Sequence, residues 1–302
     1  MYTDFLKEIA SYMKEEDIKT DELMSKHTSF RVGGPAKVFL TVHSEEILKK
    51  IVLALKEYQL PYFVLGNGSN LLVSDEGYEG VMVYLGEEFS NVEVRGTKIR
   101  AKAAALLGKV ARMAMEEELT GLEFAAGIPG SIGGGVVMNA GAYGGELSQV
   151  ITAVRVMNSE GEIVTLEKDV LLLGYRTSIF KTTPYIILEV FMELQRGDKE
   201  AIQGKMKEYT KARVEKQPLE YPSAGSTFKR PEGHFAGKLI MDAGLRGYRV
   251  GDAQVSEKHC GFVINRGNAT ATEIRTLMAD VAKKVKEDFG VDLEAEVILL
   301  GK

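Results

Sequence analysis

The chain has 302 residues, of which 45% are hydrophobic and 27% charged, with a formal net charge of −5 and a pI near 5.6. This length exceeds the size at which one hydrophobic core usually stops growing, so two or three domains are expected, and the composition excludes a disordered or fibrous chain. The acidic balance gives no electrostatic footprint for nucleic acid, and the single cysteine, Cys260, excludes an internal disulfide and any cysteine-built zinc or iron–sulfur site.

The N-terminal half alternates predicted helices and strands. Residues 1–24 are charged throughout and contain no apolar stretch of the length that a signal peptide or membrane span needs, which favours a cytoplasmic protein. Ser44 opens a segment whose apolar residues recur on one helical face, which predicts a capped amphipathic helix. A buried strand is predicted at 62–65, followed by the polar glycine loop 66–70. Further strands are predicted at 81–84, 92–94, 99–101, 154–157 and 186–194.

The C-terminal part has a different pattern. A charged helix is predicted from about Asp198 to Lys216, and the proline-marked connector 218–222 that follows it indicates a domain boundary. Thr270 and Glu273 form a capping box before a well-phased apolar helix that Gly290 closes. A terminal strand is predicted at 294–300. No fixed-period repeat or low-complexity tract is present, which argues against a solenoid.

Glycines concentrate in residues 124–145. Glycine loses much backbone entropy on folding, so such a run indicates positive φ angles or close approach of backbone amides to a ligand. The loops 66–70 and 127–135 both lack lysine, which favours a diphosphate held by main-chain N–H groups with Asn and Ser side chains. The alternative is a set of tight turns in glycine-rich β-structure. A Rossmann fingerprint is rejected because 130–133 lacks a preceding strand and an acidic ribose partner, and a P-loop because no Gly-Lys-Ser/Thr follows either loop.

Six motifs together carry a family resemblance. They are HTSFRVGGPA (27–36), LGNGSNLL (65–72), AGIPGS (126–131), GYRTSIFK (174–181), YPSAGSTFKRP (221–231) and EAEV (294–297). In this order and with compatible spacing, they closely resemble the UDP-N-acetylenolpyruvoylglucosamine reductase (UDP-N-acetylmuramate dehydrogenase) family, in its shorter form, which lacks a substrate-covering tyrosine loop. The resemblance covers roughly residues 20–300.

The resemblance implies a fold and a reaction. The implied fold is α+β: a vanillyl-alcohol-oxidase-type (PCMH-type) FAD-binding region over 1–200, with subdomains at about 20–80 and 81–200, and a substrate-binding α+β domain over 201–302. The implied cofactors are bound FAD and NADPH as reductant. The implied reaction is the reduction of UDP-N-acetylglucosamine enolpyruvate to UDP-N-acetylmuramate in peptidoglycan precursor synthesis, by a cytoplasmic protein that contributes to cell shape and division and is expected to be a monomer.

The resemblance also implies three catalytic residues. Arg176 would bind the enolpyruvyl carboxylate and stabilise the charge that hydride addition places there, although an arginine beside a tyrosine in a loop is more often a surface ion pair. Ser226 would protonate the resulting carbanion, with help from Lys229, although a hydroxyl after glycine more often caps a turn. Glu296 would protonate or hydrogen-bond the enol carboxylate; on an apolar strand it is either solvent-facing, with Glu294, or buried with a raised pKa.

Binding residues are implied by the same motifs. The cofactor candidates are Gly66, Asn67, Gly68, Ser69, Asn70, Leu71, Ala126, Gly127, Pro129, Gly130, Ser131, Gly133, Gly134, Asn139, Gly141 and Arg213. The substrate candidates are Tyr175, Lys229, Arg230, Gln254 and His259. Structural roles are open alternatives for His259, for Tyr175 packed in its loop and for Arg213 on a charged helix face. No metal site is expected, because the four histidines show no ligand spacing.

Two other functions remain compatible with these residues. An oxidase of hydroxy acids or alcohols on the same fold would share the glycine loops without needing the arginine, serine and glutamate. A non-catalytic binder of UDP-sugars would need none of the catalytic matches. Neither alternative explains as many residues as a reductase does.

Overall fold

The structure is a computed structural model that describes residues 2–301, and their contacts divide them into two compact units. Unit 1 consists of 2–20, 38–67 and 80–212, and unit 2 of 21–37, 68–79 and 213–301. Each unit has its own hydrophobic core. The limits expected from the sequence, 1–200 and 201–302, divide the chain by function and stay a prediction.

The described residues contain three helices that the sequence predicted and further helices that it did not. The α-helices are α1 (Tyr2–Ile9), α2 (Glu45–Glu57), α3 (Leu107–Glu116), α4 (Ile132–Val137), α5 (Lys199–Lys216), α6 (Ala236–Asp242) and α7 (Ala271–Phe289). The three predicted helices are confirmed as α2, α5 and α7. Ser44 caps α2 by accepting a hydrogen bond from Ile47 N, and the capping box and left-handed Gly290 delimit α7. Between residues 2 and 301, no helix combines the length and apolarity that crossing a membrane requires.

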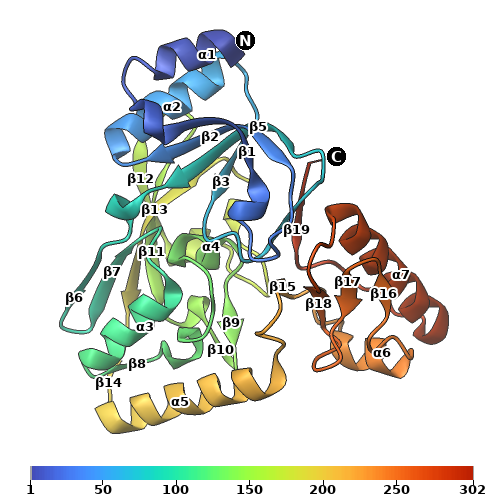
Figure 1. Cartoon of the computed structure of the whole chain (residues 1–302). Helices are drawn as coiled ribbons and strands as arrows, with labels where there is room; N and C mark the ends of the chain where they lie inside the picture. Colours follow the sequence, from blue (N-terminus) through green and yellow to red (C-terminus); the bar gives the residue numbers. More distant parts are fainter. Residues whose placement is uncertain (1, 302) are drawn as a thin grey trace. The chain divides into compact units, whose positions relative to one another are not determined.

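The largest sheet of unit 1 is antiparallel, with the strand order β12-β11-β13-β7-β6 (Figure 1). Its strands are β6 (Val92–Arg95), β7 (Lys98–Lys102), β11 (Ile151–Met157), β12 (Ile163–Glu167) and β13 (Ile186–Glu193). Ala101, Val154 and Val190 pair across three strands and are buried on one face, because side chains alternate between the two faces of a strand. The helices α3 and α4 contact strands of this sheet.

Smaller sheets complete this part of the chain. A four-stranded sheet has the order β1-β2-β5-β3, in which β3 and β5 are parallel. Its strands are β1 (Ile18–Leu23), β2 (Pro35–Val42), β3 (Tyr62–Leu65) and β5 (Tyr78–Leu85). Two-stranded sheets are formed by β8 (Leu119–Thr120) with β14 (Gln195–Arg196) and by β9 (Gly141–Ala142) with β10 (Gly145–Glu146). The helices α1 and α2 lie side by side (Figure 1).

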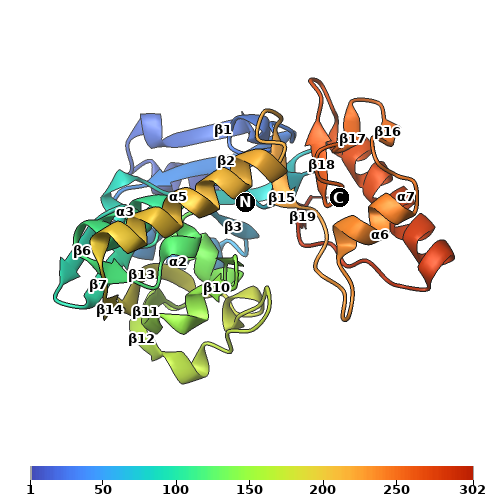
Figure 2. The same cartoon turned by 90° about the horizontal axis from the view of Figure 1, so that it is seen from below.

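Unit 2 is built on a second antiparallel sheet, of order β15-β18-β17-β16. Its strands are β15 (Ser223–Ser226), β16 (Arg249–Val250), β17 (Ala253–Val255) and β18 (Phe262–Asn265). The helix α7 packs against this sheet and α6 packs against α7, as both views show (Figures 1 and 2). The predicted apolar stripe of α7 is buried, at about 1.5–3 kcal/mol for each large side chain. A parallel pair, β4 (Leu71–Val73) with β19 (Ile298–Leu300), joins two distant segments of the same unit.

Two expected elements differ in the structure. The loop expected at 127–135 ends at Ser131, which caps the helix α4 that begins at Ile132. The glycines of α4 allow it to pack closely, since a Cβ on Gly133 would lie 3.0 Å from Ala103 Cβ. The terminal strand expected at 294–300 begins only at Ile298. Before it, Ala295 bridges to Phe228, whereas Ile298 pairs with Leu71, so the segment changes its hydrogen-bonding partner between these two residues.

Candidate functional site

The two glycine loops meet within unit 1. A Cβ on Gly66 would lie 2.7 Å from Ser131 Oγ, and Asn67 Nδ2 donates to Pro129 O at 2.5 Å. Ser131 Oγ also accepts from Gly134 N at 3.3 Å, as the N-cap of α4. Residues more than 60 positions apart in the sequence therefore form one glycine-lined surface. Because glycine has no side chain, a ligand can approach the backbone of this surface closely.

The remaining candidates of the second glycine loop lie either in the turn before α4 or in α4 itself. Ala126, Gly127, Pro129 and Gly130 lie in the partly exposed turn before α4. Gly133 N donates to Ala103 O at 2.9 Å, so this amide is used within the fold. Gly134, one residue later, is exposed.

In unit 2 the first glycine loop continues through Gly68, Ser69 and Asn70 into Leu71, the first residue of β4. Gly68 has a φ of +58°, and a Cβ there would lie 1.9 Å from His27 O, so only glycine fits. Asn70 Nδ2 donates to Glu296 O at 3.1 Å, and Asn70 O accepts from Ile298 N at 3.0 Å. The candidate cofactor loop thus holds the backbone on both sides of Val297.

Arg176 lies in a tight turn of unit 1. The N–H and C=O groups of Gly174 and Thr177 bond to each other across this turn, and Arg176 itself has a left-handed φ of +53°. Its Nη2 donates to Gly141 O at 3.0 Å, and its guanidinium lies 5.2 Å from the centre of the Tyr175 ring. The alternative in which Tyr175 holds the arginine loop against the core is not supported, because Tyr175 is 51% exposed.

Ser226 and Glu296 are brought together by unit 2. Ser226 ends β15, is exposed, and follows Gly225, which has a φ of +76°. Glu296 N donates to Thr227 O at 2.9 Å, so the two candidates lie on adjacent backbone segments. Glu296 is half-buried and precedes the terminal strand, while Glu294 is exposed. The strand alternation used to place Glu296 therefore does not apply, because the segment is not yet a strand there.

The substrate candidates of unit 2 are mostly engaged with protein groups. Lys229 Nζ pairs with Glu294, and the Arg230 guanidinium lies 3.9 Å from the centre of the Phe235 ring. Gln254 is buried; its amide donates to Gly247 O at 3.1 Å and accepts from Arg266 at 3.2 Å. Arg213 lies in the last turn of α5.

His259 is held in one neutral tautomer. Burial lowers the pKa of its imidazole, and its Nδ1 accepts a hydrogen bond from Gly261 N at 3.1 Å. A neutral ring that accepts at Nδ1 carries its proton on Nε2. His259 can therefore offer one N–H donor to a ligand at neutral pH.

One residue that the sequence analysis did not single out connects these elements. Ser29 N donates to Gly68 O at 3.0 Å, and its Oγ donates to Ser223 O at 2.6 Å. All three residues belong to unit 2, so this serine ties the glycine loop to the strand that ends in Ser226. Its place in the motif at 27–36 was a sequence signal for Ser29, but the sequence did not indicate what that motif does.

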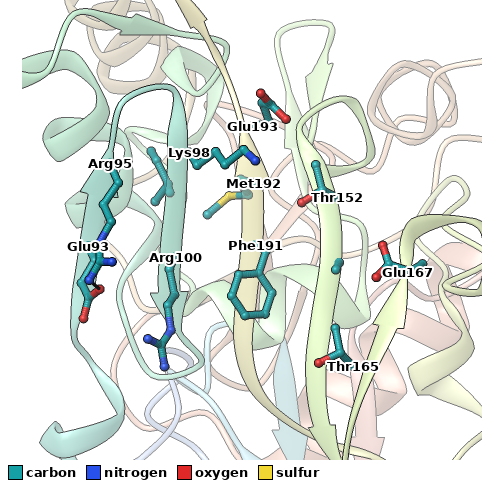
Figure 3. A pocket seen from close by; sticks show the side chains of 12 residues that line it. Glu93, Arg95, Lys98, Arg100, Thr152, Thr165, Glu167, Phe191, Met192 and Glu193 are labelled. Carbon is teal, nitrogen blue, oxygen red and sulfur yellow. Dashed lines mark hydrogen bonds and ion pairs between the residues drawn. The ribbon is translucent and has the colours of Figure 1, made fainter.

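A hollow of about 520 Å³ lies elsewhere on unit 1, over the outward face of the five-stranded sheet. Figure 3 shows Glu93, Arg95, Lys98, Arg100 and Phe191 projecting into it from β6, β7 and β13. None of the candidate residues lines it, and it has no glycine loop. This hollow is therefore not the candidate active site, despite its size. Among residues 2–301, no group of three or more His, Cys, Asp or Glu side chains is arranged to hold a metal ion.

Comparison with known proteins places the chain in a family. A UDP-N-acetylenolpyruvoylglucosamine reductase of Clostridium novyi is 51% identical over 299 residues, covering 99% of this chain and 97% of that protein. One from Clostridium kluyveri is 49% identical and covers 100% and 99%. The chain belongs to the UDP-N-acetylenolpyruvoylglucosamine reductase family.

Family models and solved structures agree with this membership. The C-terminal domain of UDP-N-acetylenolpyruvoylglucosamine reductase matches residues 217–300, and an FAD binding domain matches 36–167. The crystal structure of the reductase from Thermus caldophilus has a TM-score of 0.82 at 37% identity, covering 94% of this chain and 99% of that one. A 4-ethylphenol oxidase of Gulosibacter chungangensis, at 16% identity and a TM-score of 0.50, shares the fold over 64% of this chain and 42% of its own. The family resemblance and the PCMH-type α+β fold are thereby confirmed.

Proposed function

We propose that this chain uses NADPH and bound FAD to reduce UDP-N-acetylglucosamine enolpyruvate to UDP-N-acetylmuramate, a step in peptidoglycan precursor synthesis. The observation that carries the proposal is identity near 50% to reductases of this name along almost the whole chain. The FAD binding domain and the reductase C-terminal domain occur in one chain, a combination that neither a non-catalytic binder of UDP-sugars nor an oxidase would require.

The glycine surface fits a dinucleotide cofactor. Gly66 leaves the space that a Cβ would take beside Ser131, and Gly68 adopts a φ that other residues rarely reach. We assign FAD contacts to the loops 66–71 and 126–134, with Gly141 and Arg213 as further candidates. Held there, FAD would supply the redox chemistry that carries a hydride from NADPH to the enolpyruvyl group.

Arg176 is assigned to the substrate carboxylate. Hydride addition to an alkene conjugated with a carboxylate moves negative charge onto that carboxylate, so preorganised donors there lower the barrier. Its planar guanidinium can bind both carboxylate oxygens at once. The Gly141 carbonyl accepts a hydrogen bond from Arg176 Nη2 and so limits the rotation of the guanidinium.

Ser226 and Glu296 are assigned to proton transfer. Ser226 is exposed at the end of β15 and can donate a proton to the ether-bearing carbon, whose bond to oxygen stays intact. A serine hydroxyl is a weak acid, so it needs a neighbour that stabilises the alkoxide. Glu296, on the adjacent segment, is assigned to hydrogen-bond the enol carboxylate or to protonate it. Lys229 has its charge paired with Glu294, which makes it a poorer helper for Ser226 than the sequence suggested.

Several finer properties belong to this proposal. NADPH is the reductant, and the enzyme is a monomer. The UDP-sugar site includes Tyr175, Lys229, Arg230, Gln254 and His259. It acts in the cytoplasm, where nucleotide-activated sugars are made, without nucleic acid or membrane partners. Through cell-wall synthesis it supports cell shape and division.

One spectrophotometric experiment tests the function. The purified protein is examined for flavin absorbance, then mixed anaerobically with NADPH and afterwards with UDP-N-acetylglucosamine enolpyruvate. We expect bleaching by NADPH and recovery of the colour when the sugar is added. A flavin that bleaches but is not reoxidised by the sugar would favour an oxidase, and failure to bind FAD even after reconstitution would refute the proposal.

A further inference from the structure

Asn139 is a completely buried polar residue whose amide is used at both ends. Its Nδ2 donates to Gly174 O at 3.0 Å, and its Oδ1 accepts from Ser148 N at 2.8 Å. Its φ is +42°, in the left-handed region that asparagine tolerates better than most residues. A buried amide with both ends satisfied by backbone groups fixes those groups relative to each other.

The two groups that Asn139 joins both determine where Arg176 lies. Gly174 begins the tight turn that carries Arg176, and Gly174 O therefore anchors that turn. Ser148 follows the β9–β10 hairpin, which begins at Gly141, the residue whose carbonyl accepts from Arg176 Nη2. Asn139 thus connects the backbone from which the side chain departs to the backbone on which its guanidinium rests.

A second contact holds the same hairpin. The rings of Tyr143, at the hairpin tip, and Tyr209, on α5, are stacked with centroids 4.4 Å apart and planes 6° apart. The hairpin is therefore fixed at its tip by this stack and at its base by Asn139. All of these residues belong to unit 1.

We propose that Asn139 is a positioning residue for Arg176, rather than a ligand of the cofactor. The proposal rests on the proposed function of Arg176 as the carboxylate-binding residue. The Asn139 side chain has no exposed surface, so FAD could contact its amide only if the residues packed around it moved apart. Holding the arginine turn requires no such movement.

Two substitutions separate the parts of this role. Asn139→Asp keeps an oxygen to accept from Ser148 N, but its second oxygen faces Gly174 O and can bond to it only when the carboxyl is protonated. Burial and the facing carbonyl both raise the pKa of such a carboxyl, so lowering the pH restores the lost donor. Asn139→Gly keeps the left-handed backbone and removes the amide entirely.

The readout is binding of a carboxylate, measured without turnover. Flavin absorbance changes give the Kd of the holoenzyme for UDP-N-acetylmuramate, which has the carboxylate, and for UDP-N-acetylglucosamine, which lacks it. The ratio of the two constants isolates the carboxylate contact from the rest of the UDP-sugar site. Glu189→Gln is the control, because it weakens a buried ion-pair network of unit 1 that does not include the arginine turn.

We expect Arg176→Ala and Asn139→Gly each to lower the preference for the carboxylate ligand about tenfold or more, as a lost charge-assisted hydrogen bond would. The double variant should lose no more than Arg176→Ala alone. Asn139→Asp should regain the preference as the pH falls, while the wild type and the Glu189→Gln control stay constant.

Different results overturn different claims. If Arg176→Ala keeps the preference, the function proposed for Arg176 is wrong, and this inference fails with it. If Arg176→Ala loses the preference but both Asn139 variants keep it, only the positioning role is wrong. Loss of FAD from the Asn139 variants, with the preference intact in the remaining holoenzyme, would instead make Asn139 a cofactor residue.

Discussion

Glu189 is a buried carboxylate that holds two arginines on the five-stranded sheet. Its side chain is 1% exposed; its Oε1 accepts from Arg100 Nε and Nη2 at 3.0 and 2.6 Å, and its Oε2 accepts from Arg155 Nη1 at 3.3 Å. Arg155 also donates twice to Glu45 on α2, at 2.6 and 2.7 Å. Replacing Glu189 by alanine would therefore remove the link between the two arginines and weaken the tie to α2.

The size of the effect follows from how far each arginine can reach water. Removing one partner of a buried ion pair costs about 3–5 kcal/mol when the other stays uncompensated. Arg100 is 47% exposed and can be rehydrated, and Arg155 keeps Glu45. We therefore expect Glu189→Ala to lower the free energy of unfolding by about 2–3 kcal/mol, which for a unit of this size corresponds to about 4–12 °C in Tm.

Thermal and urea unfolding followed by circular dichroism would measure this loss. The control is Glu93→Gln on β6 of the same sheet, where an exposed pair with Arg95 at 3.2 Å should contribute less than about 0.5 kcal/mol. If Glu189→Ala and Glu93→Gln cost the same, the buried network does not stabilise the fold and the reasoning is wrong.

Three further predictions concern the site and its surroundings. Gly68→Ala should lose bound FAD, because its Cβ would overlap His27 O, whereas Gly204→Ala in α5 meets nothing within 4 Å and should keep it; equal flavin content in the two would refute this. Ser226→Ala should slow reoxidation of the flavin by the enolpyruvyl sugar about 10²-fold or more while NADPH still bleaches it at the wild-type rate in stopped-flow absorbance. Hydrogen bonds to Glu88 and then Asp17 raise the pKa of His43 above its usual 6.5. Protonated His43 therefore stabilises the fold fully below pH 6.5, and this stabilisation is lost as the pH rises through the higher pKa of the folded state. His43→Gln should remove this pH dependence from the Tm.

Local signals in the sequence predicted much of the fold. The cap at Ser44 and the capping box at Thr270 involve residues three positions apart, so they act before any tertiary contact forms. The glycine loops were likewise visible because a left-handed φ, as at Gly68, is a property of one residue. The motifs that carried the family resemblance are local for the same reason.

Contacts between distant segments could not be predicted in this way. Nothing near Asn139 in the sequence indicates that its amide reaches Gly174, and nothing near Asn70 indicates that it holds the carbonyl of Glu296. The place of Glu296 before a strand, rather than in one, likewise depends on which backbone its segment meets at each step. The sequence by itself determined helix ends, turn glycines and the residue types of the site, because those depend on a few neighbouring residues. Only the tertiary structure decided which buried donors meet which acceptors, because that requires the packed chain.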